Sequence, residues 1–169
     1  GMSAITLLTI QNTKGLREVQ LIDPRRIMAQ IDAVLDDIPP AAAKTGALGS
    51  GEFIRLLAKR AKSFTFPLVI DPVMISKHGT ALFAMEARKV FLEDLLPCAA
   101  LITPNLYEAE KFVDFPVNDL QSMEKAAKYI FDMGAKAVLV KGGHLEGKEA
   151  ADVLYVYGKS EILHSPHIE

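Results

Sequence analysis

The sequence predicts an α/β fold built on a mostly parallel sheet. Two observations lead to this prediction: short runs that are apolar throughout, and amphipathic helical stretches that separate them. Strands that are apolar along their whole length are typical of parallel sheets covered by helices on both faces. The expected order is β-α-β-α-β-α-β-α-α-β, followed by a hairpin. We find no internal repeat or linker, so residues 1–169 are expected to form a single domain, or part of one.

Runs rich in aliphatic and β-branched residues predict the strands. They lie at residues 5–10, 41–45, 67–70, 99–102 and 137–140. The first is expected to be a buried strand that the polar stretch 11–15 ends, whereas the second is weak. Two further runs, 153–157 and 161–164, flank a Gly-Lys pair at residues 158–159 and predict the hairpin.

Apolar residues at helical spacing and capping residues predict the helices. We expect Asp23 and Pro24 at the N-cap and first position of one helix, and Ser50 and Asn105 at the N-caps of two others. Two more helices are predicted by apolar stripes, namely Phe83, Ala87, Val90 and Phe91, and Met123, Ala126, Ala127, Ile130 and Phe131.

Composition narrows the class of protein. The 169 residues include 19 basic and 21 acidic side chains. The chain therefore lacks the excess of basic residues that would indicate a nucleic-acid partner. No apolar run approaches the roughly 18 residues of a membrane span. The single cysteine, Cys98, excludes a disulfide framework and is expected to be a small buried residue. We therefore expect a soluble cytoplasmic domain that binds neither nucleic acid nor membrane.

Polar residues and glycines follow the predicted strands. In open parallel sheets, ligands bind outside the carboxyl ends of the strands. The residues at these ends are Gln11-Asn12, Gly46, Asp71, Thr103-Pro104-Asn105 and Lys141-Gly142-Gly143. Lysine and backbone N–H groups neutralise phosphate oxygens, while carboxylate and amide oxygens hold Mg²⁺ or its waters. The pattern predicts a phosphorylated ligand bound with a metal ion at one sheet edge.

Each of these residues also has a purely structural interpretation. Asn105 and Glu108 form an N-x-x-E capping box, and the residues alone favour that role. Asp71 precedes a proline and fits a turn cap. Lys141-Gly142-Gly143 is neither a Walker A sequence nor a G-x-G-x-x-G, and the four histidines show no metal-ligand spacing. The residues alone therefore predict no more than a phosphate ligand on an α/β sheet.

Four segments in order resemble one family. They are GMSAITLLTIQNT at 1–13, VIDPVMISKHG at 69–79, LITPNLYEAE at 101–110 and VLVKGGH at 138–144. The chain resembles the hydroxymethylpyrimidine/phosphomethylpyrimidine kinases of thiamine biosynthesis, in the ribokinase-like superfamily. The last two segments are also typical of the related pyridoxal kinases. The resemblance implies a three-layer α/β/α fold with a mostly parallel central sheet, incomplete at its N- and C-termini.

The resemblance implies a substrate pocket at one set of residues. Gln11, in the QNT motif, would contact the pyrimidine, and Val73 and Gly46 would line the same pocket. The family often carries methionine after this glycine, whereas this chain has Ala47. That departure bears on how the substrate fits.

The resemblance implies phosphate and metal roles at another set. Asp71 would act near the phosphates of Mg·ATP. Asn105 and Glu108 would hold Mg²⁺ and phosphate, with Asp71 and Glu108 reaching the metal directly or through water. Lys141 would bind phosphate and act in catalysis by stabilising charge on the transferred phosphoryl group.

The implied reaction is ATP-dependent phosphorylation of 4-amino-5-hydroxymethyl-2-methylpyrimidine, and then of its monophosphate. A homodimer is expected by analogy alone. The family carries a D-x-S-G-G-A-G segment before the QNT strand and a G-T-G-C or G-T-G-D motif after the position of Ile168, and neither is in these 169 residues. Cys98 does not match the catalytic cysteine. The general base is therefore absent, and we expect this central portion alone to be inactive.

Two other hypotheses stay open on the sequence. One is a pyridoxal or pyridoxine kinase-like vitamin kinase, which differs in substrate but not in chemistry. The other is a short homologue without catalysis that binds a ligand or only dimerises. The missing base and anion hole are the sequence features that favour the second of these.

Overall fold

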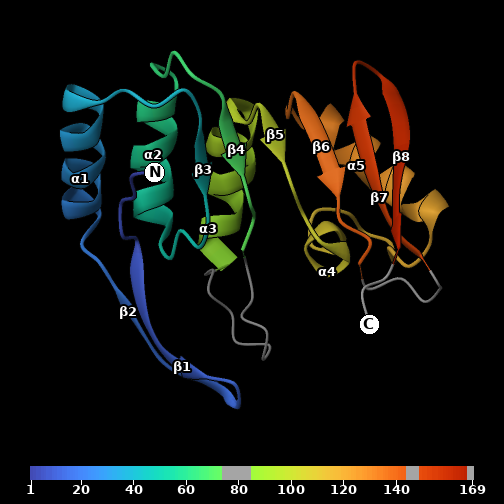
Figure 1. Ribbon diagram of the computed structural model, residues 1–169, viewed down its shortest axis with the longest axis horizontal. Coiled ribbons are helices and arrows are strands. Elements are labelled where there is room, and N and C mark those ends of the chain that lie inside the picture. Colours follow the sequence, from blue (N-terminus) through green and yellow to red (C-terminus); the bar gives the residue numbers. More distant parts are fainter. Residues whose placement is uncertain (74–84, 144–148, 167–169) are drawn as a thin grey trace.

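The computed structural model describes residues 1–73, 85–143 and 149–166 (Figure 1). The described residues form a six-stranded sheet of order β3-β4-β5-β6-β7-β8 and a separate two-stranded ribbon of β1 and β2. The strands of the main sheet are β3 (Ala43–Thr45), β4 (Leu68–Ile70), β5 (Leu101–Ile102), β6 (Ala137–Val140), β7 (Glu149–Val156) and β8 (Lys159–Pro166). Strands β3 to β6 are parallel, and β7 and β8 are antiparallel additions. The predicted α/β fold with a mostly parallel sheet is confirmed.

The predicted C-terminal hairpin is also present, with its turn one residue earlier than the expected Gly158-Lys159 pair. Strands β7 and β8 are joined by Tyr157 and Gly158, whose φ angles are 52° and 76°. Positive φ at both central residues defines a type I′ turn, whose twist matches that of the flanking strands. The strands extend several residues further than the apolar runs at 153–157 and 161–164 predict, because backbone pairing continues beyond the apolar side chains.

The predicted helices form where capping and periodicity place them. They are α1 (Pro24–Asp37), α2 (Gly51–Ala61), α3 (Met85–Val90), α4 (Leu106–Glu110) and α5 (Leu120–Asp132). Asp23 accepts hydrogen bonds from two N–H groups of the first turn of α1, and Ser50 caps α2. A π turn at Phe91–Leu95 and a 3₁₀ turn at Leu96–Cys98 continue α3. Phe83 lies outside the described residues. Among the described helices, none has the length and apolar character of a membrane span.

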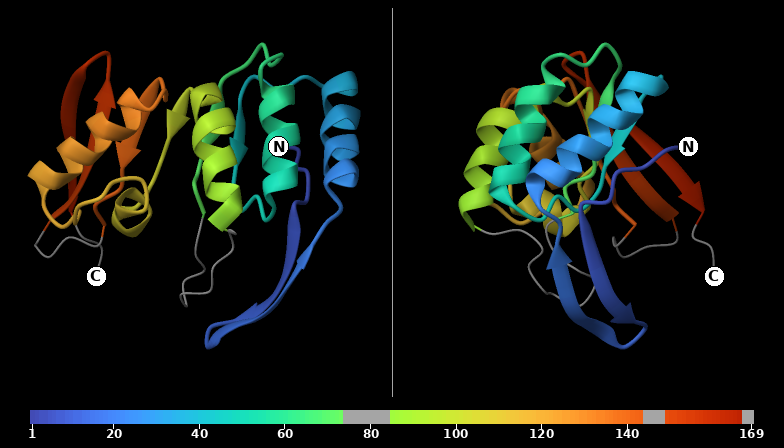
Figure 2. Two further views of the ribbon diagram at one scale, coloured as in Figure 1. Left: turned by 180° about the vertical axis from the view of Figure 1, so that it is seen from behind. Right: turned by 90° about the vertical axis from the view of Figure 1, so that its left-hand side faces the viewer.

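One face of the sheet carries most of the core. Helices α2, α3 and α5 lie on this face, and α1 packs beside α2 at the β3 edge (Figures 1 and 2). Ile54, Ile70, Ile102, Ile130 and Val138 are completely buried between helices and sheet. The described helices therefore account for one of the two helical layers that are expected to cover the faces of the sheet.

The first predicted strand does not belong to the main sheet, and the expectation of a buried strand at residues 5–10 is wrong. Strand β1 (Leu7–Asn12) pairs antiparallel with β2 (Gly15–Leu21). Leu8 and Ile10 are about half exposed, at 47% and 54%. An apolar run specifies a strand but not its partner, and here a second strand follows after a two-residue turn. The ribbon extends beyond the lower edge of the sheet in Figure 1.

Candidate functional site

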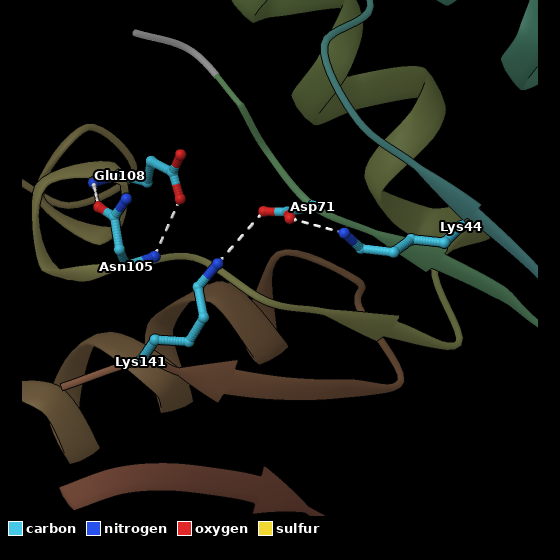
Figure 3. Close-up of polar contacts among 5 residues, drawn as sticks. All are labelled: Lys44, Asp71, Asn105, Glu108 and Lys141. Carbon is cyan, nitrogen blue, oxygen red and sulfur yellow. Dashed lines mark hydrogen bonds and ion pairs between the residues drawn. The ribbon is translucent and has the colours of Figure 1, made fainter. Parts of the chain in front are cut away.

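Polar residues from separate strands meet at the carboxyl end of the parallel strands (Figure 3). Asp71 directly follows β4, and Lys141 directly follows β6. The backbone N–H of Lys141 donates to the carbonyl oxygen of Pro104 at 2.8 Å, and Asn105 and Lys141 form an isolated parallel bridge. Sheet pairing thus brings Asp71, Asn105 and Lys141 together across three neighbouring strands, as the strand-end rule predicts.

The Asp71 carboxylate lies between two ammonium groups. Lys141 Nζ is 3.3 Å from Oδ1, and Lys44 Nζ is 2.9 Å from Oδ2. The Asp71 side chain is 18% exposed. Lys44 comes from β3 and was missed by the sequence interpretation. Its only signal is a charged residue in the middle of a short strand, which strand-end reasoning passes over.

Asn105 and Glu108 form the predicted capping box at the start of α4. The Asn105 N–H donates to Glu108 Oε2, and the Glu108 N–H donates to Asn105 Oδ1, both at 2.9 Å. This confirms the structural interpretation of the N-x-x-E motif. The box uses Oε2 of Glu108 and not Oε1. Capping therefore leaves one oxygen of this carboxylate for another contact.

Burial dominates the electrostatics of Glu108, whose residue is 7% exposed. Desolvation raises the pKa of its carboxyl above the ordinary 4.5, and the Asn105 N–H and the Lys141 ammonium partly oppose this shift. The Asp71 carboxylate adds to the rise in pKa. Glu108, Asp71 and Lys141 therefore form one electrostatic group, in which a positive charge would relieve both carboxylates.

A carboxylate on β7 fixes the turn after Lys141. Asp152 Oδ1 accepts a hydrogen bond of 2.8 Å from the N–H of Gly142. The sequence interpretation did not single out Asp152. Its signal is a carboxylate between Ala151 and Val153, next to the apolar part of β7, where a half-buried charge needs a partner.

The structure does not gather all three predicted substrate residues at the sheet edge. Val73 follows Asp71, is half-buried, and donates its N–H to the Asp71 carbonyl at 2.9 Å. Gly46 is exposed just after β3. Gln11 is exposed near the tip of the β1–β2 ribbon, so its expected place at the end of a main-sheet strand is wrong. Residues 74–79 of the second family-like segment and His144 lie outside the described residues.

The donor set fits a metal ion that arrives with a ligand. Among the described residues, no group of three or more His, Cys, Asp or Glu side chains could hold a metal. Asp71 and Glu108 offer two carboxylates close to a lysine. Mg²⁺ is usually held by one or two carboxylates together with substrate phosphates and water. These residues therefore fit Mg²⁺ bound with a nucleotide better than a permanently bound ion.

Cys98 takes no part in this group. Its residue is half-buried, and its thiol donates to the carbonyl oxygens of Ala58 and Asp94 at 3.8 and 3.6 Å. Burial is the main cause that raises the pKa of the thiol. Burial thus disfavours the reactive thiolate form.

The chain is similar to known vitamin kinases over nearly all of its length. The sequence model of the family "Phosphomethylpyrimidine kinase" matches residues 1–169. A hydroxymethylpyrimidine/phosphomethylpyrimidine kinase from Synechococcus elongatus is 42% identical over 147 residues, which are 87% of this chain and 56% of the relative. The chain thus spans little more than half the length of that relative.

Solved structures agree with the sequence match. The crystal structure of phosphomethylpyrimidine kinase from Clostridium difficile 630 superposes with a TM-score of 0.84 at 41% identity, covering 96% of this chain and 70% of that one. The pyridoxal kinase of Staphylococcus aureus, in complex with AMP-PCP and pyridoxal, superposes with a TM-score of 0.85 at 28% identity, covering 98% and 60%. With its fold, its strand-end charges and the match over residues 1–169, the chain belongs to the phosphomethylpyrimidine kinase family.

Proposed function

We propose that this chain carries the phosphate-binding part of a kinase for 4-amino-5-hydroxymethyl-2-methylpyrimidine and its monophosphate, with ATP as donor. The observation that carries the proposal is the group of Lys141, Asp71 and Glu108 at the carboxyl ends of the parallel strands. Its charges suit a Mg²⁺-bound polyphosphate. The family membership and a neighbour that binds AMP-PCP support the same chemistry.

Each residue of this group has a defined task in the proposal. Lys141, whose side chain is 38% exposed, turns from Asp71 towards the transferred phosphoryl group and stabilises its developing charge. Asp71 and the Glu108 Oε1, which the capping box does not use, face the metal or its waters. Bound Mg²⁺ would neutralise phosphate charge and orient the reacting oxygens. Asn105 holds Glu108 in place through the capping box.

The substrate side of the proposal uses Gln11, Val73 and Gly46. Gln11 belongs to β1, and the β1–β2 ribbon extends on the side of the sheet to which the carboxyl ends of the parallel strands point (Figure 1). The general base is assigned by resemblance to a G-T-G-C or G-T-G-D motif that these 169 residues do not contain. The 169-residue chain alone is therefore expected to show at most weak ATP binding and no measurable transfer. Cytoplasmic location and a homodimer stay predictions.

The test is a side-by-side phosphorylation assay. The complete gene product is incubated with Mg·ATP and either the hydroxymethylpyrimidine, its monophosphate or pyridoxal, and the phosphorylated products are quantified by mass spectrometry. We expect both pyrimidine steps, with kcat/KM higher than for pyridoxal. No product from any of the three substrates would refute a kinase. Substantial turnover by the 169-residue chain would refute the assignment of the base to the missing motif.

Pyridoxal phosphorylation is the second candidate function. One observation favours it: the Staphylococcus aureus neighbour, which covers 98% of this chain, was crystallised with pyridoxal. The same assay decides between the two, because a clear preference for pyridoxal would replace the pyrimidine as substrate without changing the phosphate chemistry. Size-exclusion chromatography with light scattering of the same sample tests the homodimer.

A further inference from the structure

The contact between Lys44 and Asp71 is not explained by the roles assigned above. Asp71 is engaged through both carboxylate oxygens, by Lys44 at 2.9 Å and by Lys141 at 3.3 Å. Figure 3 shows the two lysines approaching the carboxylate from opposite sides. The Lys44 contact is the shorter one. The lysine with no assigned role is thus the closer partner of Asp71.

The sheet itself places Lys44 for this contact. Lys44 is the middle residue of β3 and is paired in register with Val69 of β4. Side chains two residues apart along an extended chain point to the same side, so Asp71 lies on the Lys44 side of the sheet. Lys44 sits on the edge strand, on the far side of Asp71 from Lys141. Its position is therefore set by backbone pairing rather than by a flexible loop.

Movement of Lys141 during phosphoryl transfer gives Lys44 a role. If Lys141 turns to the phosphoryl group, as the proposed function requires, Asp71 loses one of its two partners. Without Lys44, this 18% exposed carboxylate would then lose both of its ammonium partners and could rotate away from the metal or its waters. Lys44 would keep the carboxylate paired and aimed throughout the step. Resting on the proposed function, we propose that Lys44 is a positioning residue that holds Asp71 in place and so frees Lys141 for the phosphoryl group.

The simpler explanation is an ordinary surface ion pair. The Lys44 side chain is 60% exposed, and exposed ion pairs contribute little to stability. The two explanations make different predictions. A surface pair predicts no effect of its removal on turnover, whereas a positioning role predicts a loss of kcat with little change in stability or in KM for the vitamin.

The experiment compares Lys44→Met with a matched control. Lys128 pairs with Asp132 on α5, its side chain is 58% exposed, and Lys128→Met removes an ion pair outside the site. In the complete gene product we expect Lys44→Met to lower kcat about 10- to 100-fold, the range that misplacement of a reacting group can cost. KM for the pyrimidine and the midpoint of thermal unfolding should stay near wild type. Lys128→Met should match wild type in all three, and Lys44→Arg should recover much of the lost kcat.

Two further measurements distinguish failure of the positioning role of Lys44 from failure of the proposed function. In an Asp71→Asn background, Lys44→Met should cause no further loss of residual kcat, because Lys44 acts through Asp71. The proposal would be overturned if the two substitutions caused additive losses of kcat in the double variant. It would also be overturned if, in an active enzyme, Lys44→Met had the same kcat as Lys128→Met. A wild-type enzyme that phosphorylates none of the vitamin substrates would instead refute the proposed function. If Lys44→Met fails to fold, Lys44→Gln with unchanged kcat overturns the proposal equally.

Discussion

Two features of the Glu108 environment shift the pKa of its carboxyl in opposite directions. As the third residue of α4, Glu108 accepts the Asn105 N–H at 2.9 Å, which favours the carboxylate. Its burial is the larger influence and raises its pKa above 4.5. The helix cap would be met as well by an uncharged glutamine. The charge of Glu108 is therefore a cost to folding that a ligand-binding role would explain.

The pH dependence of stability tests this cost. Because the folded pKa is raised, the native state binds more protons than the unfolded state at pH values between 4.5 and the folded pKa. Stability from this group is thus complete below 4.5 and is lost as the pH rises through the folded pKa. Glu108→Gln should remove this loss. The free energy of unfolding of the variant, relative to that of wild type, should therefore increase with pH. Urea denaturation at several pH values measures it.

Asp119 is the matched control for this prediction. Its carboxylate accepts hydrogen bonds from the Ser122 hydroxyl and N–H at the start of α5, and these bonds lower its pKa below 3.8. Its stabilising contribution is present above 3.8 and is lost as the pH falls through the folded pKa. Asp119→Asn should therefore show the opposite trend, converging with wild type in acid. Trends in the same direction for the two variants would contradict one of the two assignments.

Lys141 and Gln11 should separate kinetically if their roles differ. Lys141→Ala should lower kcat of the complete enzyme by roughly 100-fold or more with a small change in KM, because its charge is used most in the transition state. Gln11→Ala should instead raise KM for the pyrimidine and leave kcat nearly unchanged. Steady-state kinetics with each substrate varied in turn give both parameters. Equal effects of both variants on both parameters would contradict the assigned roles.

At the scale of elements, the helix starts are where local sequence has most control. Ser50 Oγ accepts the Phe53 N–H at 3.2 Å, and α2 then buries Phe53, Ile54 and Leu57 against the sheet. The cap and the first buried side chains lie within one helical turn. Loss of the cap would therefore weaken the anchoring of the helix that flanks β3.

Replacement of Ser50 tests the cap of α2. Ser50→Ala should lower the free energy of unfolding by about 1 kcal/mol, the usual effect of removing an N-cap side chain. Ser50→Asn, which keeps an acceptor, should stay close to wild type. Urea denaturation followed by circular dichroism measures both. A Ser50→Asn variant as unstable as Ser50→Ala would mean that packing of the serine, and not its hydrogen bond, stabilises α2.

At the scale of the molecule, a continuous core connects the strands that carry the site. Ile70 and Ile102 are fully buried and directly paired in β4 and β5, and Val138 of β6 pairs with Ile102. Asp71 and Lys141 follow the ends of two of these strands. The geometry of the charged group therefore depends on the packing beneath it.

Truncation of a central core residue tests this dependence. Ile102→Ala should lower the free energy of unfolding by about 2–5 kcal/mol, because the side chain is fully buried and the sheet cannot close the cavity. Leu163→Ala on β8, where the side chain is 42% exposed, is the control and should cost much less. Chemical denaturation of both variants gives the difference. Similar losses would show that β8 contributes to the core as strongly as β5.

The sequence by itself determined the helices, the parallel strands and the placement of Asp71, Asn105 and Lys141 at the strand ends. Caps such as Asp23 and Ser50 act on N–H groups two or three residues away, and Asp71, Asn105 and Lys141 are each the residue that follows, or nearly follows, a strand. The strand-end rule then needs only the order of the strands. Local signals and one topological rule were sufficient for these features.

The tertiary structure alone decided the features that depend on a distant partner. Residues 5–10 have the composition of a buried strand, but their burial depended on which strand they pair with, and β2 was the partner. Lys44 and Asp152 are separated by 27 and 10 residues from the groups they bind, and their sequence neighbours do not indicate which groups these are. Pairing and ion contacts across the sheet are long-range properties. Folding therefore added to the site a second lysine that strand-end reasoning had not included.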